Sequence, residues 1–78
     1  MKKTKTTFVL CVDNTDYEAS LVLGKVYPLV QDPVAAKDDL VRIVDESGED
    51  YLYDRTHFEF VDFPAAVKKK LLALQHPS

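Results

Sequence analysis

The segment from residue 40 to residue 53 constrains the fold of this chain more than any other. Strand-forming runs at 40–44 and 51–53 lie on either side of the pair Ser47-Gly48, and this pattern is typical of a β-hairpin. A two-residue turn at Ser47 and Gly48 fixes the register of the two strands. It predicts three cross-strand pairs, which are Val44 with Tyr51, Ile43 with Leu52, and Arg42 with Tyr53.

The predicted register gives the hairpin two different faces, because side chains alternate along a strand. Ile43 and Leu52 are expected on the core side. Arg42, Tyr51 and Tyr53 are expected on the opposite, partly exposed side. Arginine and tyrosine are enriched at protein-binding hot spots, although stacking of Arg42 on Tyr53 would also stabilise the sheet without any partner. The candidate partner-binding residues of this face are Arg42, Tyr51, Tyr53 and a tyrosine from the preceding loop, Tyr17.

Three further strands are predicted outside the hairpin, at residues 8–12, 26–30 and 58–61. Each is bounded by polar or glycine-containing turns. Pro28 has no N–H group, so its strand must have a free edge or a bulge at that position. Residues 34–37 have helical potential, and residues 54–57 suit one turn of tight helix. Five short strands spaced by turns predict an all-β barrel.

The last part of the chain, 62–76, changes to a helical pattern, because Ala, Lys and Leu dominate it. Its apolar residues form one stripe on such a helix: Phe63, Val67, Leu71 and Leu74. An isolated helix of about a dozen residues is marginally stable in water, so the stripe must dock. Three places are open to it, namely its own barrel, where it would plug an open end, a second copy of the chain, or another protein. Phe63, Val67 and Leu71 are accordingly candidate partner-binding residues.

The order of the segments from 8 to 61 resembles the SH3 domain. The likeness rests on four blocks. Residues 10–14 correspond to the first strand and its motif, and residues 23–27 to the diverging turn. Residues 46–49 correspond to the distal hairpin, and residues 54–58 to the 3-10 turn. More closely, the blocks Cys-Val-Asp-Asn (11–14), Leu-Gly-Lys-Val-Tyr (23–27) and Asp-Glu-Ser-Gly-Glu-Asp-Tyr-Leu-Tyr (45–53) are similar to a group of small, uncharacterised bacterial proteins with this barrel plan.

This resemblance implies a five-stranded SH3-like barrel over 8–61. The polar start of the chain, which lacks a pattern, predicts a flexible N-terminus at 1–7, and the helical pattern described above predicts a C-terminal helix at 62–76. It implies no activity. SH3 domains that bind proline-rich peptides grip them between stacked aromatic side chains. This chain has no tryptophan, and Cys11 and Asn14 stand where the first SH3 motif has tyrosines. Binding of a polyproline helix is therefore not expected.

Charge and composition argue against several partners. The net charge of -3 and the pI near 5.2 disfavour nucleic acid, since general affinity for phosphate backbones comes from clustered Lys and Arg. The single cysteine, Cys11, excludes an intrachain disulfide and fits a reducing cytoplasm. No apolar run approaches the roughly 20 residues of a membrane span. A cytoplasmic protein that does not bind a membrane is expected.

No arrangement of residues points to catalysis, a cofactor or a metal. Cys11 lies in mid-strand without a positive neighbour, so a buried structural thiol is expected. His57 is expected to cap the tight turn rather than to act as a base. The acidic clusters at 13–18 and 45–50 lack the spacing of a calcium loop and are interpreted as solvated turn charges.

The sequence therefore predicts a non-catalytic protein–protein interaction module or small accessory subunit, without a cofactor. Its partner is either an unknown protein or a second copy of the chain, bound through the C-terminal helix. Two alternatives stay open. One is a nucleic-acid-associated SH3-like module, and the other is a small-ligand sensor or small enzyme that uses His57 and the tyrosines.

Overall fold

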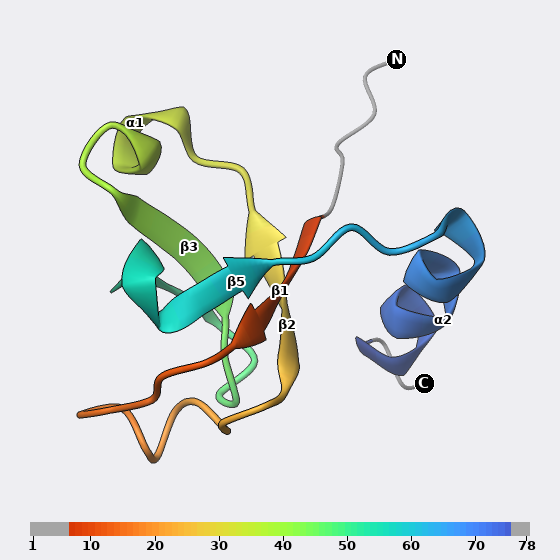
Figure 1. Cartoon of the computed structure of the whole chain (residues 1–78), viewed down its shortest axis with the longest axis horizontal. Coiled ribbons are helices and arrows are strands. Elements are labelled where there is room, and N and C mark those ends of the chain that lie inside the picture. The colour runs from red at the N-terminus through yellow and green to blue at the C-terminus, as the bar shows by residue number, and fades with distance from the viewer. Residues whose placement is uncertain (1–6, 76–78) are drawn as a thin grey trace.

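Five antiparallel strands form a single sheet that curls into a half-barrel, and one helix follows at the C-terminal end (Figure 1). This arrangement is that of a computed structural model, which describes residues 7–75. The prediction of a mostly β fold with a C-terminal helix is confirmed. The predicted flexible segment 1–7 lies outside the described residues except for Thr7, as does residue 76 of the predicted helix.

The elements occur close to the positions that the sequence predicts. The strands are β1 (Thr7–Cys11), β2 (Val26–Val30), β3 (Leu40–Val44), β4 (Asp50–Asp54) and β5 (Phe58–Phe60). The helical segments are α1 (Pro33–Ala36), the 3-10 helix η1 (Arg55–His57) and α2 (Ala65–Gln75). The element types agree with the prediction, and only their ends differ by a few residues.

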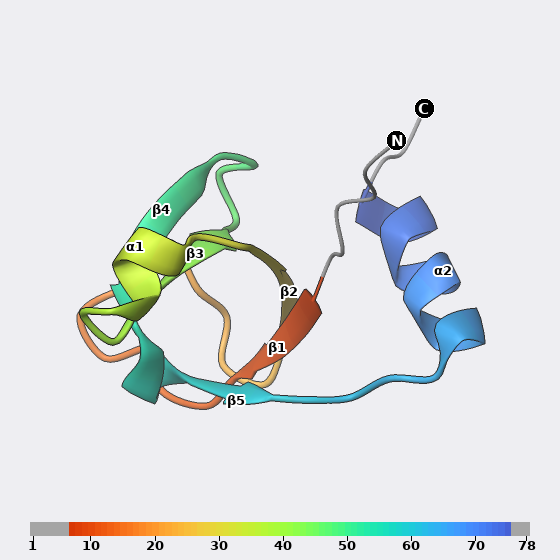
Figure 2. The same cartoon turned by 90° about the horizontal axis from the view of Figure 1, so that it is seen from above.

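The strands follow the order β4-β3-β2-β1-β5, so β1 pairs with both β2 and β5. Figure 2 shows the curl of this sheet from above. The pairing of β2 with β3 begins at Leu29, one residue after Pro28. Because Pro28 has no N–H to donate to a neighbouring strand, this late start agrees with the free edge predicted at that position.

The main hydrophobic core lies on one side of the sheet, because alternate residues of each strand point to that side. Its members are Val9, Cys11, Leu21, Tyr27, Leu29, Val41, Ile43, Tyr53 and Phe58. Phe8, which alternates with Val9 and Cys11 along β1, is also fully buried but outside this cluster. Its ring meets that of Phe63 edge-on, with 6.4 Å between the ring centroids. The linker before α2 is therefore anchored on the side of β1 away from the core.

The hairpin exists, but its predicted register is wrong. The loop contains three residues, 46–48, because the Asp45 N–H donates to the Glu49 carbonyl at 3.2 Å and the Gly48 N–H donates to the Asp45 carbonyl at 3.0 Å. Gly48 has a φ of 86°, which completes a type I turn followed by a left-handed residue. The observed pairs are Ile43 with Tyr51, Arg42 with Leu52, and Val41 with Tyr53.

This shift of one residue reverses the faces of β4. Tyr53 is 4% exposed and belongs to the core, whereas Leu52 is 43% exposed. The predicted surface of Arg42, Tyr51 and Tyr53 is therefore corrected, because Arg42 lies on the opposite side of the hairpin from both tyrosines. Tyr51 shares the side of Tyr53 but stays half exposed, and its hydroxyl donates to Glu49 at 3.0 Å.

The Asp45 carboxylate explains the three-residue loop. It is the buried charged group of the described core, with 7% exposure. Its Oδ1 accepts hydrogen bonds from the Ser47 N–H at 2.9 Å and the Ser47 hydroxyl at 2.6 Å, and its Oδ2 accepts one from the Tyr53 hydroxyl at 2.6 Å. An aspartate that bonds to the backbone two residues on stabilises a turn directly. The same carboxylate accepts the hydrogen bond of the Tyr53 hydroxyl, which this register places in the core.

The helix α2 does not plug the barrel, which argues against the first of the three docking places open to it. None of the residues 65–74 is buried, and α2 stands beside the half-barrel rather than in its opening (Figures 1 and 2). Of the predicted stripe, Phe63 contacts Phe8, whereas Val67 is 38% and Leu74 is 75% exposed. Leu71 is partly exposed. Only the linker end of the stripe is held by the barrel.

We predict that Tyr53→Phe destabilises the protein by about 1.5–3 kcal/mol, because it leaves a buried carboxylate oxygen without its donor. Urea unfolding at neutral pH measures this difference. The matched control is Tyr51→Phe, which removes an exposed hydroxyl and should leave the stability nearly unchanged. Equal effects of the two substitutions would contradict the role given to Asp45 and Tyr53.

A second prediction concerns the pH dependence of stability. Burial raises the pKa of Asp45, but the hydrogen bonds from Ser47 and Tyr53 outweigh burial and hold the pKa below its usual range. A carboxyl with a lower pKa in the folded state contributes stability above about pH 5 that is lost as the pH falls through about 4 and below. Asp45→Asn should therefore be less stable than the wild type at pH 7, with a gap that narrows by pH 3. Urea titrations at both pH values test this, and a gap independent of pH would refute it.

Candidate binding groove

The short helix α1 forms one wall of a groove at the edge of the core. Its start is fixed by Asp32, whose Oδ1 accepts a hydrogen bond from the Ala35 N–H at 3.0 Å, and by Pro33 in the first turn. Aspartate at the N-cap and proline in the first helical turn are both favoured at the beginning of a helix. Ala35 is buried and packs α1 toward the sheet.

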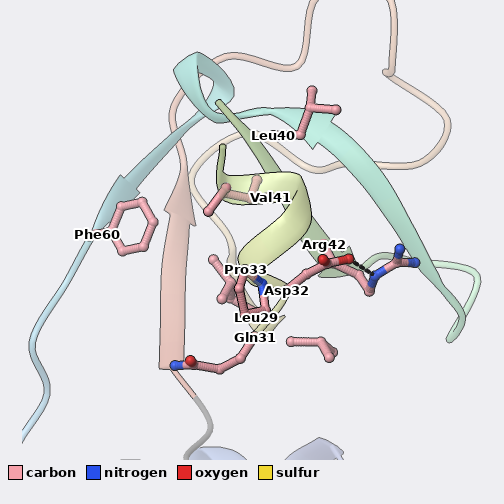
Figure 3. A pocket seen from close by; sticks show the side chains of 10 residues that line it. Leu29, Gln31, Asp32, Pro33, Leu40, Val41, Arg42 and Phe60 are labelled. Atoms are coloured by element: carbon pink, nitrogen blue, oxygen red, sulfur yellow. Dashed lines mark hydrogen bonds and ion pairs between the residues drawn. The ribbon is translucent and has the colours of Figure 1, made fainter. Parts of the chain in front are cut away.

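The groove lies between α1, β2, β3 and β5, and its volume is about 280 Å³ (Figure 3). Its lining is mainly apolar and consists of Leu29, Val30, Gln31, Asp32, Pro33, Ala36, Leu40, Val41, Arg42 and Phe60. Phe60 projects from β5 toward α1 and Val41 in Figure 3 and is 50% exposed. Small-molecule pockets usually have about 300–1,000 Å³, so this groove suits inserted side chains better than an enclosed ligand.

A charged pair forms the rim on the β3 side. Arg42 Nε donates to Asp32 Oδ2 at 2.9 Å, and Arg42 Nη1 lies 3.5 Å from Asp50 Oδ2. The hydrogen bond from the Ala35 N–H, followed by that from Arg42, holds the pKa of Asp32 below its usual range. Asp32 is therefore ionised at neutral pH, and the positive charge of Arg42 is balanced by two carboxylates.

A cluster of aromatic rings connects the loop after β1 with η1. Tyr17 meets Tyr53 edge-on at 4.9 Å and His57 at 5.3 Å between ring centroids. His57 Nδ1 donates to the Asp13 carbonyl at 2.6 Å, so the imidazole joins two parts of the chain. Tyr17 is 40% exposed, but its edge-on contacts give it a packing role here.

The predicted site residues do not form one surface. Arg42 lies at the groove, Tyr17 packs on Tyr53, and Tyr51 is on the hairpin. Phe63, Val67 and Leu71 belong to α2 and its linker. The apolar lining, above all Leu29 and Phe60, was not predicted. Alternation with the buried Phe58 indicates which side Phe60 faces, but not that the side chain stays half exposed.

The two side chains considered for catalysis, Cys11 and His57, both have structural roles. Cys11 is fully buried, and burial raises the pKa of its thiol. His57 is held by Asp13 as described. Across residues 7–75, no group of three or more His, Cys, Asp or Glu side chains is arranged to hold a metal ion. In the same range, every helix is too short or too polar to cross a lipid bilayer.

We predict that Asp32→Ala loosens α1 and the groove, because it removes both the N-cap and the partner of Arg42. The midpoint of thermal unfolding should fall by about 4 °C or more. Asp38→Ala, which removes an exposed carboxylate after α1, is the control and should leave the midpoint nearly unchanged. Equal midpoints for the two variants would show that the cap does not support α1.

Comparison with known proteins assigns the chain to no family: no family model, no curated protein and no solved structure matches it. The groove is therefore interpreted from its own geometry and charge.

Proposed function

We propose that this chain is a non-catalytic, SH3-like protein interaction module whose groove beside α1 binds a segment of a protein partner. The observation that carries the proposal is an apolar groove with a half-exposed phenylalanine, Phe60, in its lining. Aromatic residues in apolar surface patches are enriched at binding hot spots.

Strand order supports the SH3-like part of this proposal. In the order β4-β3-β2-β1-β5 the last strand returns to pair with the first, as in SH3-like barrels. The 3-10 helix η1 between β4 and β5 is a further point of likeness. We also propose that the chain is similar to small bacterial proteins with this barrel plan, on the blocks at 11–14, 23–27 and 45–53.

Charge indicates which partners the module suits. Residues 7–61 carry four basic and twelve acidic side chains, which gives a formal charge of -8 with histidine neutral. Two cations lie at the groove. Arg42 lines it and is paired with Asp32 and Asp50, and the guanidinium carbon of Arg55 lies 5.8 Å from the centroid of the Phe60 ring. The acidic side chains of the segment still outnumber its cations three to one. Such a surface favours partner segments that combine apolar and basic residues, since complementary charge speeds association and suppresses wrong partners.

The non-catalytic assignment is supported by what the candidate chemical groups do. A general base must reach a substrate proton within hydrogen-bond distance, whereas His57 Nδ1 is bonded to a backbone carbonyl. A reactive cysteine needs a lowered pKa and access, whereas Cys11 is buried with a raised pKa.

We predict that Phe60→Ser lowers the amount of partner that co-purifies with the tagged protein from its native host by about tenfold or more, because it removes the groove's aromatic anchor. The matched control is Leu52→Ser. Leu52 is similarly exposed, at 43% against 50% for Phe60, but does not line the groove.

Circular dichroism and urea unfolding establish that both variants are folded before the capture is compared. If Phe60→Ser retains the partner as well as the control does, the groove is not the binding surface and the proposed function is wrong at this site.

A further inference from the structure

The helix α2 has apolar side chains for which its own barrel provides no buried contact. Among its described side chains none is buried. Val67 and Leu74, which share one face of the helix, are 38% and 75% exposed, and Leu72, on another side, is 37% exposed. The helix has eleven residues, and an isolated helix of this length is marginally stable in water. An apolar helix face in this state is stabilised by a surface that covers it.

The charges of the chain complement one another between its two parts. The segment 65–75 carries three lysines, Lys68, Lys69 and Lys70, and no acidic residue. The barrel segment 7–61 has a formal charge of -8. Carboxylates also lie close to the groove: Asp32 is part of its lining, Asp50 lies beside the lining residue Arg42, and Asp54 pairs with Leu40 across the hairpin. The groove therefore provides an apolar lining for the exposed stripe of α2, on a barrel whose net negative charge is opposite to that of the helix.

The helix cannot reach the groove of its own chain while its anchor is in place. Phe63 packs on Phe8, which points away from the core side of β1. Only Pro64 separates this anchor from Ala65, the first residue of α2. A single residue does not let the helix turn around the sheet to the core side, where Val41 and Leu29 line the groove. Releasing Phe63 would also expose part of Phe8, which is now fully buried.

We infer that the partner of the groove is a second copy of this chain, with α2 of each copy seated in the groove of the other. This inference rests on the proposed function of the groove and names its occupant. In a two-fold dimer both helices and both grooves are covered. Closed dimers of this kind are the commonest symmetric assemblies. The stripe of Val67, Leu71 and Leu74 meets Phe60 and the apolar lining, and the lysines of α2 meet the neighbouring carboxylates.

Sedimentation velocity over a range of concentrations tests the inference with the full chain. The wild type should dimerise as concentration rises. Leu74→Asp in the helix and Phe60→Asp in the groove should each raise the dimer dissociation constant by about 100-fold or more, because each change removes an apolar contact in both halves of the dimer. The matched control is Val34→Asp, which adds the same charge at a 72% exposed position outside the groove lining and should dimerise like the wild type.

Mixing the two variants gives a sharper test. A chain with Phe60→Asp keeps its helix, and a chain with Leu74→Asp keeps its groove, so one intact contact exists only in the mixed pair. The mixture should associate more strongly than either variant alone. A wild type that stays monomeric, a Leu74→Asp variant that dimerises normally, or a mixture no stronger than its components would each overturn the inference.

Two results separate this inference from the proposed function. If the chain is monomeric while Phe60→Ser still loses a captured protein, the groove binds a foreign partner and only the second-copy inference fails. If the chain dimerises without dependence on Phe60, and Phe60→Ser also retains every captured protein, both fail. Leu74 is highly exposed, so Leu74→Asp should fold even if Phe60→Asp does not, and the test then rests on the helix variant.

Discussion

The hydrogen bonds of one buried carboxylate, that of Asp45, hold the hairpin in the register on which the rest of the fold depends. The carboxylate closes the turn through Ser47 and receives the hydroxyl of Tyr53. Burial, followed by the hydrogen bond to Asp45, raises the pKa of Tyr53 to about 12, so this tyrosine stays neutral inside the core. A buried polar pair of this kind is favourable because each group satisfies the other.

The same turn is tied to the rest of the barrel through Glu46. Its N–H donates to the Ser20 carbonyl at 3.0 Å, and its carboxylate accepts from Lys25 at 2.6 Å and from the Tyr27 hydroxyl at 2.5 Å. The hairpin tip and the long loop after β1 are thus joined by several bonds far apart in sequence. In a chain of 78 residues, which buries a limited core, such polar ties fix loops that apolar packing alone would leave loose.

The strands and helices could be predicted from the sequence, but the register of the hairpin and the groove could not. The strands and η1 follow from runs of strand formers and from turn residues, whose effects are local. The predicted register is wrong because the pair Ser47-Gly48 is typical of a two-residue turn. The hydrogen bond from the Ser47 N–H to the Asp45 carboxylate instead favours a three-residue loop. The groove was missed for a different reason. It depends on Leu29 and Phe60, which are distant in the chain and meet only when the sheet curls.

The position of Cys11 has a practical consequence for measuring how this protein opens. Its thiol is fully buried at the end of β1, where the Cys11 N–H donates to the Lys25 carbonyl at 2.9 Å and its carbonyl accepts from the Gly24 N–H at 2.8 Å. A disulfide-exchange reagent can reach it only when this part of the core opens. The labelling rate of this single natural cysteine therefore reports the free energy of that opening, without any engineered probe.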